Sequence, residues 1–138
     1  MEDLALHKVR LSVLWLSVLI SDFVNIFLYV INPAILKSII ETGAVEGEQL
    51  TPEFAALGAI MFLIMLVMAF LSLTLKGKAN RWSNIIVGAV YLVIWVGDSI
   101  QSLVGDSMPA SYYVLSISGI IFFMLIIWYA YKWPKKKE

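Results

Sequence analysis

Residues 20–33, ISDFVNIFLYVINP, end a long apolar run that begins at Leu11, and they place Asp22, Asn25 and Asn32 within it. An apolar run of about 20 residues is long enough to cross the hydrocarbon core of a bilayer as a helix. Ionisable groups inside such a helix are expensive, and they usually mark a functional site. The stretch therefore predicts a membrane span and raises the question of what its polar groups contact.

The composition of the whole chain favours the membrane class. The 138 residues are 61% hydrophobic and 14% charged, and the mean hydropathy is +0.88. A soluble domain of this length could not bury so much apolar surface. We predict an all-α integral membrane four-helix bundle, a single domain over residues 1–138. Its expected spans are residues 11–31, 54–75, 82–104 and 110–131.

The first outer loop is expected to hold a short amphipathic helix. The segment PAILKSIIETG begins with Pro33, has apolar residues at 35, 36, 39 and 40, and ends at Gly43. This spacing and the final glycine are typical of a surface helix and its stop signal. Thr51, followed by proline and an acid, resembles the start of the second span. Asn80 or Ser83 is expected to cap the third span.

Basic residues are distributed unevenly around the predicted spans. Nine of the ten Lys and Arg residues precede the first span, join the second to the third, or follow the fourth, and only Lys37 lies in the first outer loop. Cytoplasmic loops carry such an excess of Lys and Arg. The sequence therefore predicts a multi-pass protein of the cell's inner (plasma) membrane, with both termini in the cytoplasm.

Two spans carry polar and aromatic side chains at intervals of three and four residues, which places each set on one helical face. The first span carries Trp15, Val18, Asp22, Asn25, Tyr29 and Asn32. The third carries Asn84, Gly88, Tyr91, Trp95, Asp98 and Ser102, with Gln101 beside the last. The residues predicted to bind a ligand are Asp22, Asn25, Tyr29, Tyr91, Trp95, Asp98 and Gln101.

The two aspartates have no basic partner within the predicted spans, which contain no Lys, Arg or His. Protonation, hydrogen bonding to neutral groups and attraction of a cation are the three alternatives. Our leading hypothesis is an intramembrane polar cavity that binds a small amphiphilic or cationic ligand. A small proton- or cation-coupled transporter is the second hypothesis. The third is a structural or accessory subunit without a ligand, whose polar stripes close the interface of a homo-oligomer.

Several other functional classes lack their characteristic residues. The chain has no cysteine and one histidine, His7, so the sequence predicts neither a zinc or haem site nor any other metal or cofactor. Neither a glycine-rich phosphate loop nor a serine-nucleophile motif is present. The basic residues mark membrane edges and do not suggest nucleic acid. The partner expected for the chain is the lipid bilayer, and an enzymatic activity is less expected than binding.

The segments LWLSVLISDFVNIFLYVINPAIL, KANRWSNIIVGAV and WYAYKWP are similar to a family of small four-span bacterial membrane proteins described only as a domain of unknown function. This resemblance implies the four-span topology. In architecture the chain also resembles the emopamil-binding (EXPERA) group, which has four spans, an acid in the first, a basic turn after the second and a lysine-rich end.

The EXPERA resemblance implies a cavity for sterol-like or cationic amphiphilic ligands, with Asp22 as the first-span acid. The second-span glutamate of that group has no counterpart, and Phe62 stands near its place, which puts sterol isomerisation in doubt. The first-span acid is also similar to that of the small multidrug-resistance exporters, which exchange protons for cations. The longer chain and charged outer loop differ from those exporters.

Overall fold

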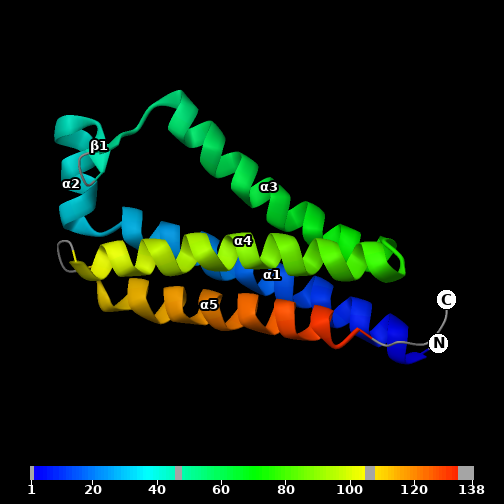
Figure 1. The fold of residues 1–138 in the computed structure, drawn as a ribbon. Coiled ribbons are helices and arrows are strands. Elements are labelled where there is room, and N and C mark those ends of the chain that lie inside the picture. Colours follow the sequence, from blue (N-terminus) through cyan, green and yellow to red (C-terminus); the bar gives the residue numbers. More distant parts are fainter. Residues whose placement is uncertain (1, 46–47, 105–107, 134–138) are drawn as a thin grey trace.

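The computed structural model describes residues 2–45, 48–104 and 108–133, and it is almost entirely helical (Figure 1). Four of its helices are long and apolar enough to cross a membrane, which confirms the predicted all-α four-helix membrane bundle. The elements in chain order are α1 (Glu2–Val30), α2 (Pro33–Thr42), β1 (Ala44–Val45), β2 (Glu48–Gln49), α3 (Pro52–Thr74), α4 (Gly77–Val104) and α5 (Ala110–Tyr131).

The helices coincide with the predicted spans but extend beyond two of them. The first helix begins at Glu2, well before the apolar run, and α4 begins at Gly77 instead of Trp82. The prediction that Asn80 or Ser83 caps this helix is therefore wrong, because both lie within it. Polar residues can continue a helix outside the hydrocarbon core, so an apolar window marks the membrane segment and not the helix end.

The predicted amphipathic helix is α2, and its ends follow the predicted signals. Asn32 is its N-cap, since the side-chain oxygen accepts a hydrogen bond from the backbone N–H of Ala34 at 3.0 Å. At the other end Gly43 adopts a left-handed conformation with φ 67°, and its N–H donates to the Ile39 carbonyl. One of the three polar residues of the opening stretch is thus explained by helix capping.

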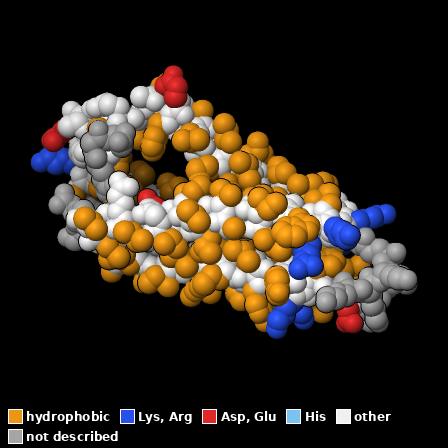
Figure 2. All heavy atoms as spheres, viewed as in Figure 1, with side chains coloured by type: hydrophobic (Ala, Val, Ile, Leu, Met, Phe, Trp, Pro, Cys, Tyr) orange, Lys and Arg blue, Asp and Glu red, His pale blue; other side chains and the backbone are white. Residues whose placement is uncertain are grey.

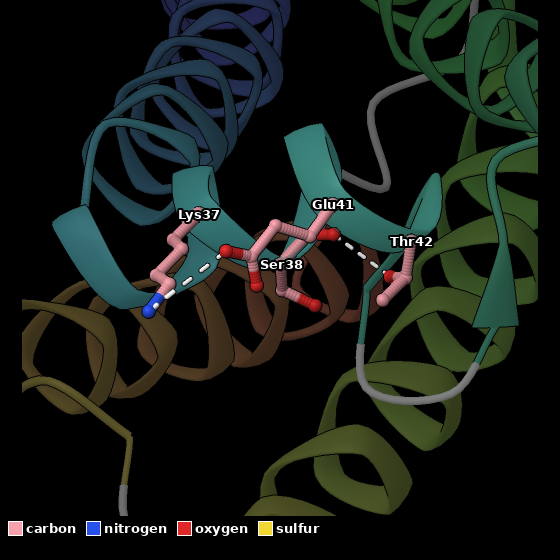
Figure 3. A network of polar contacts seen from close by, with 4 residues as sticks. All are labelled: Lys37, Ser38, Glu41 and Thr42. Atoms are coloured by element: carbon pink, nitrogen blue, oxygen red, sulfur yellow. Dashed lines mark hydrogen bonds and ion pairs between the residues drawn. The ribbon is translucent and has the colours of Figure 1, made fainter.

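Polar contacts along α2 lie on its exposed side (Figure 3). The ammonium of Lys37 lies 3.9 Å from the carboxylate of Glu41, one turn away, and Thr42 Oγ1 donates to the Ser38 carbonyl at 2.7 Å. Exposed ion pairs of this kind contribute less than about 1 kcal/mol. The network supports local helix structure and forms no enclosed site.

The connection from α2 to α3 contains a small antiparallel hairpin that the sequence did not reveal. Ala44 pairs with Gln49 across β1 and β2, where an open turn was expected. The next helix then starts as predicted, because Thr51 Oγ1 accepts a hydrogen bond from the Phe54 N–H at 3.2 Å and Pro52 occupies the first turn. The hairpin packs against α2, where the Ser38 hydroxyl donates to the Ala44 carbonyl at 3.1 Å.

The long helices do not pack evenly along their lengths. The first helix packs against α3 and α5, and α4 packs against α5, whereas α3 diverges from α4 after their tight connection (Figure 1). Correspondingly, the buried residues of α3 are Met65, Met68, Ala69 and Ser72, all in its second half. The first half of α3 leaves the bundle, and the bundle is open on that side.

The two ends of the bundle differ in charge (Figure 2). The end where α1 begins, α3 joins α4 and α5 finishes gathers the described Lys and Arg side chains apart from Lys37, and we call it the basic end. The opposite end, which we call the α2 end, carries α2 and the hairpin. Between the two ends the outer surface is largely hydrophobic, as a lipid-facing surface requires.

Candidate functional site

Trp15 and Asn84 align α1 with α4 along the bundle axis. The indole N–H of Trp15 donates a hydrogen bond to Asn84 Oδ1 at 2.6 Å. Both helices run from the basic end toward the α2 end, so equal steps along them reach similar depths. Seven residues farther on, about 10 Å along a helix, lie Asp22 and Tyr91. A further seven residues along each helix lead to Tyr29 on α1 and Asp98 on α4, which therefore lie at a similar depth.

A closed polar cluster surrounds Asn84 in the half of the bundle near the basic end. Its members are Trp15, Ser72, Asn80 and Asn84, each fully buried, and we call it the Asn84 network. Ser72 donates to Asn84 Oδ1 at 3.0 Å, and Asn84 Nδ2 donates to the Asn80 side-chain oxygen at 2.7 Å. Asn80 Nδ2 in turn donates to the Ser72 and Leu75 carbonyls. The network connects α1, α3 and α4 through satisfied groups.

An aromatic layer separates this network from the α2 end. The Tyr91 ring stacks on Phe123 with centroids 5.5 Å apart, and Trp15 contacts both rings edge-on. The Tyr91 hydroxyl donates to the Met61 carbonyl of α3 at 2.8 Å. This bond marks the depth beyond which α3 departs from the bundle.

Beyond the aromatic layer, α1 buries two polar side chains one turn apart. Asp22 is 9% exposed and Asn25 is 7% exposed. The Oδ1 atom of Asn25 is buried and accepts no hydrogen bond from the described residues. A buried amide oxygen without a donor is unfavourable by about 1–3 kcal/mol. This end of α1 therefore presents hydrogen-bonding capacity that the described protein groups leave unused.

Asp98 of α4 belongs to the same region, but it lies farther along the bundle axis toward the α2 end than Asp22 does. It lies seven residues, about two helical turns, beyond Tyr91 on α4. Asp98 itself is exposed, and its Oδ2 accepts a hydrogen bond from the hydroxyl of Tyr112 on α5. Ser102 donates to that hydroxyl at 3.0 Å. The two acids thus share one region but have different surroundings.

The molecular surface has a hollow toward the same end of the bundle. Figure 2 shows the hollow between the diverging part of α3 and the rest of the bundle near α2, with an acidic side chain visible at its edge. All residues from Phe54 to Ile64, which form the diverging part of α3, are apolar or glycine. We call Asp22, Asn25 and Asp98 together with this hollow the acidic site.

The structure brings most of the predicted site residues to this region, but not all in the predicted role. Tyr29 is half-buried and its ring lies 6.5 Å from that of Tyr112, beside Asp98. Trp95 is directed toward α5, where it contacts Phe123 at 5.7 Å. A Cβ atom at Gly119 would lie 2.6 Å from the Trp95 Nε1 atom, so the indole packs directly on that glycine.

The remaining two predicted residues also have distinct positions. Tyr91 uses its hydroxyl to join α3 and its ring face to pack on Phe123. Gln101 is exposed, next to the buried Ser102 on α4. The acids and Asn25 therefore form the polar part of the site, while Tyr91 and Trp95 form its packed wall.

Tyr112 is the functional candidate that sequence reasoning missed. It is not among the residues that the sequence predicts to bind a ligand. A usable signal was present, because the inward face of α5 follows strict helical spacing. The buried residues of that face are Tyr112, Ser116, Gly119, Phe123, Ile126 and Ala130. A tyrosine heading such a face is expected to direct its hydroxyl into the bundle and to find a partner there.

His7 is buried between two helices at the basic end. It is 7% exposed, its Nε2 lies 2.6 Å from the Tyr129 carbonyl oxygen, and its ring packs edge-on against Trp133. That contact requires the proton on Nε2. The residue joins α1 to α5 at the basic end, far from the acidic site. Among the described residues, no three His, Cys, Asp or Glu side chains form a group that could hold a metal ion.

Comparison with known proteins adds no relative. No protein-family model, curated protein or solved structure matches this chain.

Proposed function

We propose that this integral membrane protein binds a small amphiphilic or cationic molecule at the acidic site. The observation that carries the proposal is the buried, unpartnered Oδ1 of Asn25, one helical turn from the buried acid Asp22. Ligand sites in proteins are mostly apolar, with a few convergent polar groups that fix orientation. The acidic site has this composition.

Charge gives the direction of the expected preference. Asp22 and Asp98 lie at different depths of one region, and the four predicted spans contain no Lys, Arg or His to compensate them. Carboxylates within a membrane are usually paired, or they face a pathway for an ion or a substrate. A cation entering the hollow would supply the missing counter-charge, and an apolar part of the same molecule would suit the α3 wall.

The test compares wild-type protein with Asp22→Asn in lipid nanodiscs, using decylammonium as the probe and decanol as its uncharged counterpart. We expect decylammonium to raise the unfolding temperature of the wild type in a saturable manner, and to lose this effect in Asp22→Asn. A ligand at 100 times its Kd stabilises a protein by about 2.7 kcal/mol. The substitution preserves size and hydrogen-bonding capacity while removing the ionisable group.

Glu53→Gln is the matched control, because Glu53 is an exposed acid near the α2 end and the change is chemically equivalent. Decylammonium should stabilise this variant as it does the wild type. Equal stabilisation of wild type and Asp22→Asn, or an effect of decanol equal to that of decylammonium, would refute charge recognition by Asp22.

A proton- or cation-coupled transporter is the second candidate, and the presence of two acids, Asp22 and Asp98, at different depths favours it. Such a pair could pass a cation from one carboxylate to the next while exchanging protons. The discriminating measurement is acidification or alkalinisation of reconstituted vesicles after addition of decylammonium. Flux that requires Asp22 would support transport, whereas saturable binding without flux would leave the protein a binding protein.

For orientation, we propose that the basic end faces the cytoplasm of the inner membrane, as the distribution of Lys and Arg favours. The chain contains no cysteine, so single-cysteine variants label at one position only. Glu41→Cys on α2 should react with an impermeant thiol reagent from outside the cell, and Lys78→Cys should not. The reverse pattern would place the acidic site near the cytoplasm.

A further inference from the structure

We infer that the acidic site selects a cation bearing N–H groups, a protonated primary or secondary amine, over a quaternary ammonium of similar size. This inference rests on the function proposed above and specifies the headgroup of its ligand. It follows from which protein groups remain unused around the hollow.

The unused polar groups are acceptors. Asn25 Oδ1 is buried and lacks a donor among the described residues, and the Asp22 carboxylate lies one turn before it on the same helix. Residues three apart on a helix are neighbours on its surface, with about 5–6 Å between their Cβ atoms. One ammonium group has several N–H bonds directed apart, so it can donate to both oxygens at once. A trimethylammonium group has no N–H and would leave Asn25 Oδ1 unpartnered.

Asp98 has a different relation to such a headgroup. The hydroxyl of Tyr112 already donates to its Oδ2, and the residue lies about 10 Å farther along the axis than Asp22. Asp98 is also exposed, whereas Asp22 is buried. Its carboxylate can therefore attract a cation toward the hollow, while Asp22 and Asn25 hold the headgroup.

Two aromatic residues of the region, Tyr91 and Trp95, are engaged in packing and do not offer the open ring faces that quaternary ammonium sites use. The Tyr91 face stacks on Phe123 at 5.5 Å with an interplanar angle of 27°. Trp95 packs against Phe123 and on Gly119, within the α4–α5 contact. These two rings are engaged in holding the helices together, which favours recognition by hydrogen bonding and charge at Asp22 and Asn25.

The structure also indicates in which direction the apolar part of a bound ligand would extend. The diverging half of α3 is apolar from Phe54 to Ile64, and apart from the half-buried Gly58, Met61 and Phe62 its side chains are exposed. An alkyl chain attached to the headgroup can therefore extend between α3 and α4 toward the lipid. A ligand with a single alkyl tail suits this geometry, and it can reach the site from within the bilayer.

The experiment measures saturable binding of decylammonium and decyltrimethylammonium to the full chain in nanodiscs by calorimetric titration, with protein-free nanodiscs as the partition reference. We expect wild-type protein to bind decylammonium about tenfold more tightly, or better, because one charge-assisted hydrogen bond is worth at least this factor. This ranking is measured on the wild type and does not depend on any variant folding.

Asn25→Leu is the diagnostic variant, since it removes the acceptor and retains a side chain of similar size. It should reduce the affinity for decylammonium about tenfold and leave that for decyltrimethylammonium unchanged. Gln49→Leu, an amide replaced at an exposed position of β2, should change neither affinity. Selectivity retained in Asn25→Leu would overturn the role of this acceptor.

The outcomes separate this inference from the proposed function. If both probes bind wild type equally and both lose binding in Asp22→Asn, the site recognises charge alone and the inference is wrong while the proposed function stands. If neither probe binds above the protein-free reference, both are wrong. A tenfold preference for decylammonium that Asn25→Leu removes supports both.

Discussion

Each half of the bundle, the one near the basic end and the one near α2, buries an asparagine among the membrane-spanning helices. The two asparagines differ in their hydrogen bonding. Asn84 makes hydrogen bonds through both side-chain atoms, to Trp15, Ser72 and Asn80. Asn25 keeps a buried oxygen without a donor among the described residues. The same residue type is part of a closed network in one half and of an open site in the other.

The course of α3 accounts for this difference. Near the basic end α3 packs on α1 and brings Ser72 into the bundle, so the polar groups find partners. Past Met61, whose carbonyl accepts from Tyr91, α3 diverges from the bundle and has no buried residue, and the buried Asn25 Oδ1 receives no donor from the described residues. A satisfied polar group adds cohesion between helices, whereas an unsatisfied one is a candidate for recognition.

The largest effect is expected from Asn84→Leu. The substitution removes the partner of the Trp15 indole N–H and of the Asn80 side-chain oxygen, and it removes one of the two acceptors of the Ser72 hydroxyl, which keeps the Met68 carbonyl. Buried groups left without partners cost about 1–3 kcal/mol each, with partial recovery by rearrangement. We expect a loss of about 2–4 kcal/mol in unfolding free energy, measured by denaturant titration in mild detergent.

Ser83→Ala provides a control for Asn84→Leu, because Ser83 is adjacent on α4 and makes one bond to the Asn80 carbonyl, at 3.1 Å. It should cost less than about 1 kcal/mol. If Asn84→Leu costs no more than Ser83→Ala, the Asn84 network contributes little cohesion, and the contrast between the two halves loses its basis.

An intermediate effect is expected from Tyr112→Phe. This variant tests how much the hydrogen bonds of the half near α2 contribute to the free energy of unfolding. The change removes the donor to Asp98 and the acceptor of Ser102, although Ser102 retains its bond to the Asp98 carbonyl. Because Asp98 is exposed and can be hydrated, we expect a loss of about 1 kcal/mol in the same titration.

Tyr113→Phe is the matched control for Tyr112→Phe, one residue farther along α5. The Tyr113 hydroxyl reaches the Ser102 carbonyl only at 3.3 Å, so its removal should cost roughly half as much or less. Equal losses in the two variants would argue that the contact between Tyr112 and Asp98 is no stronger than an ordinary peripheral hydrogen bond.

The sequence was sufficient for the helices because their causes are local. Apolar length predicts a span, and short-range signals at Pro33, Gly43 and Thr51 predict the ends of α2 and the start of α3. The course of α3 was not predictable in this way. Its residues are apolar on every side, so no periodic face indicates which half packs against the bundle and which faces lipid.

The candidate site was predictable in part for a related reason. Polar residues at helical spacing identify a face, so Asp22, Asn25 and Asp98 could be assigned to one region from the sequence. Spacing does not reveal which partner each side chain finds on another helix. That is why Asn80 was expected to cap a helix, and why Tyr112 was not assigned to Asp98. Pairing across helices depends on packing, which the pattern of one helix does not contain.

The smallest effect, and the one of opposite sign, is expected from Asn25→Leu. The chemical change is the same as in Asn84→Leu, but here the side-chain oxygen has no partner among the described residues to lose. Removing an unpartnered polar atom from an apolar environment is favourable, so we expect the ligand-free protein to be unchanged or to gain up to about 1 kcal/mol. The measurement is the same denaturant titration, in which the two asparagine variants should move in opposite directions. A loss approaching that of Asn84→Leu would mean that Asn25 is held by cohesive contacts like those of the other half, and the acidic site would then be a second structural network.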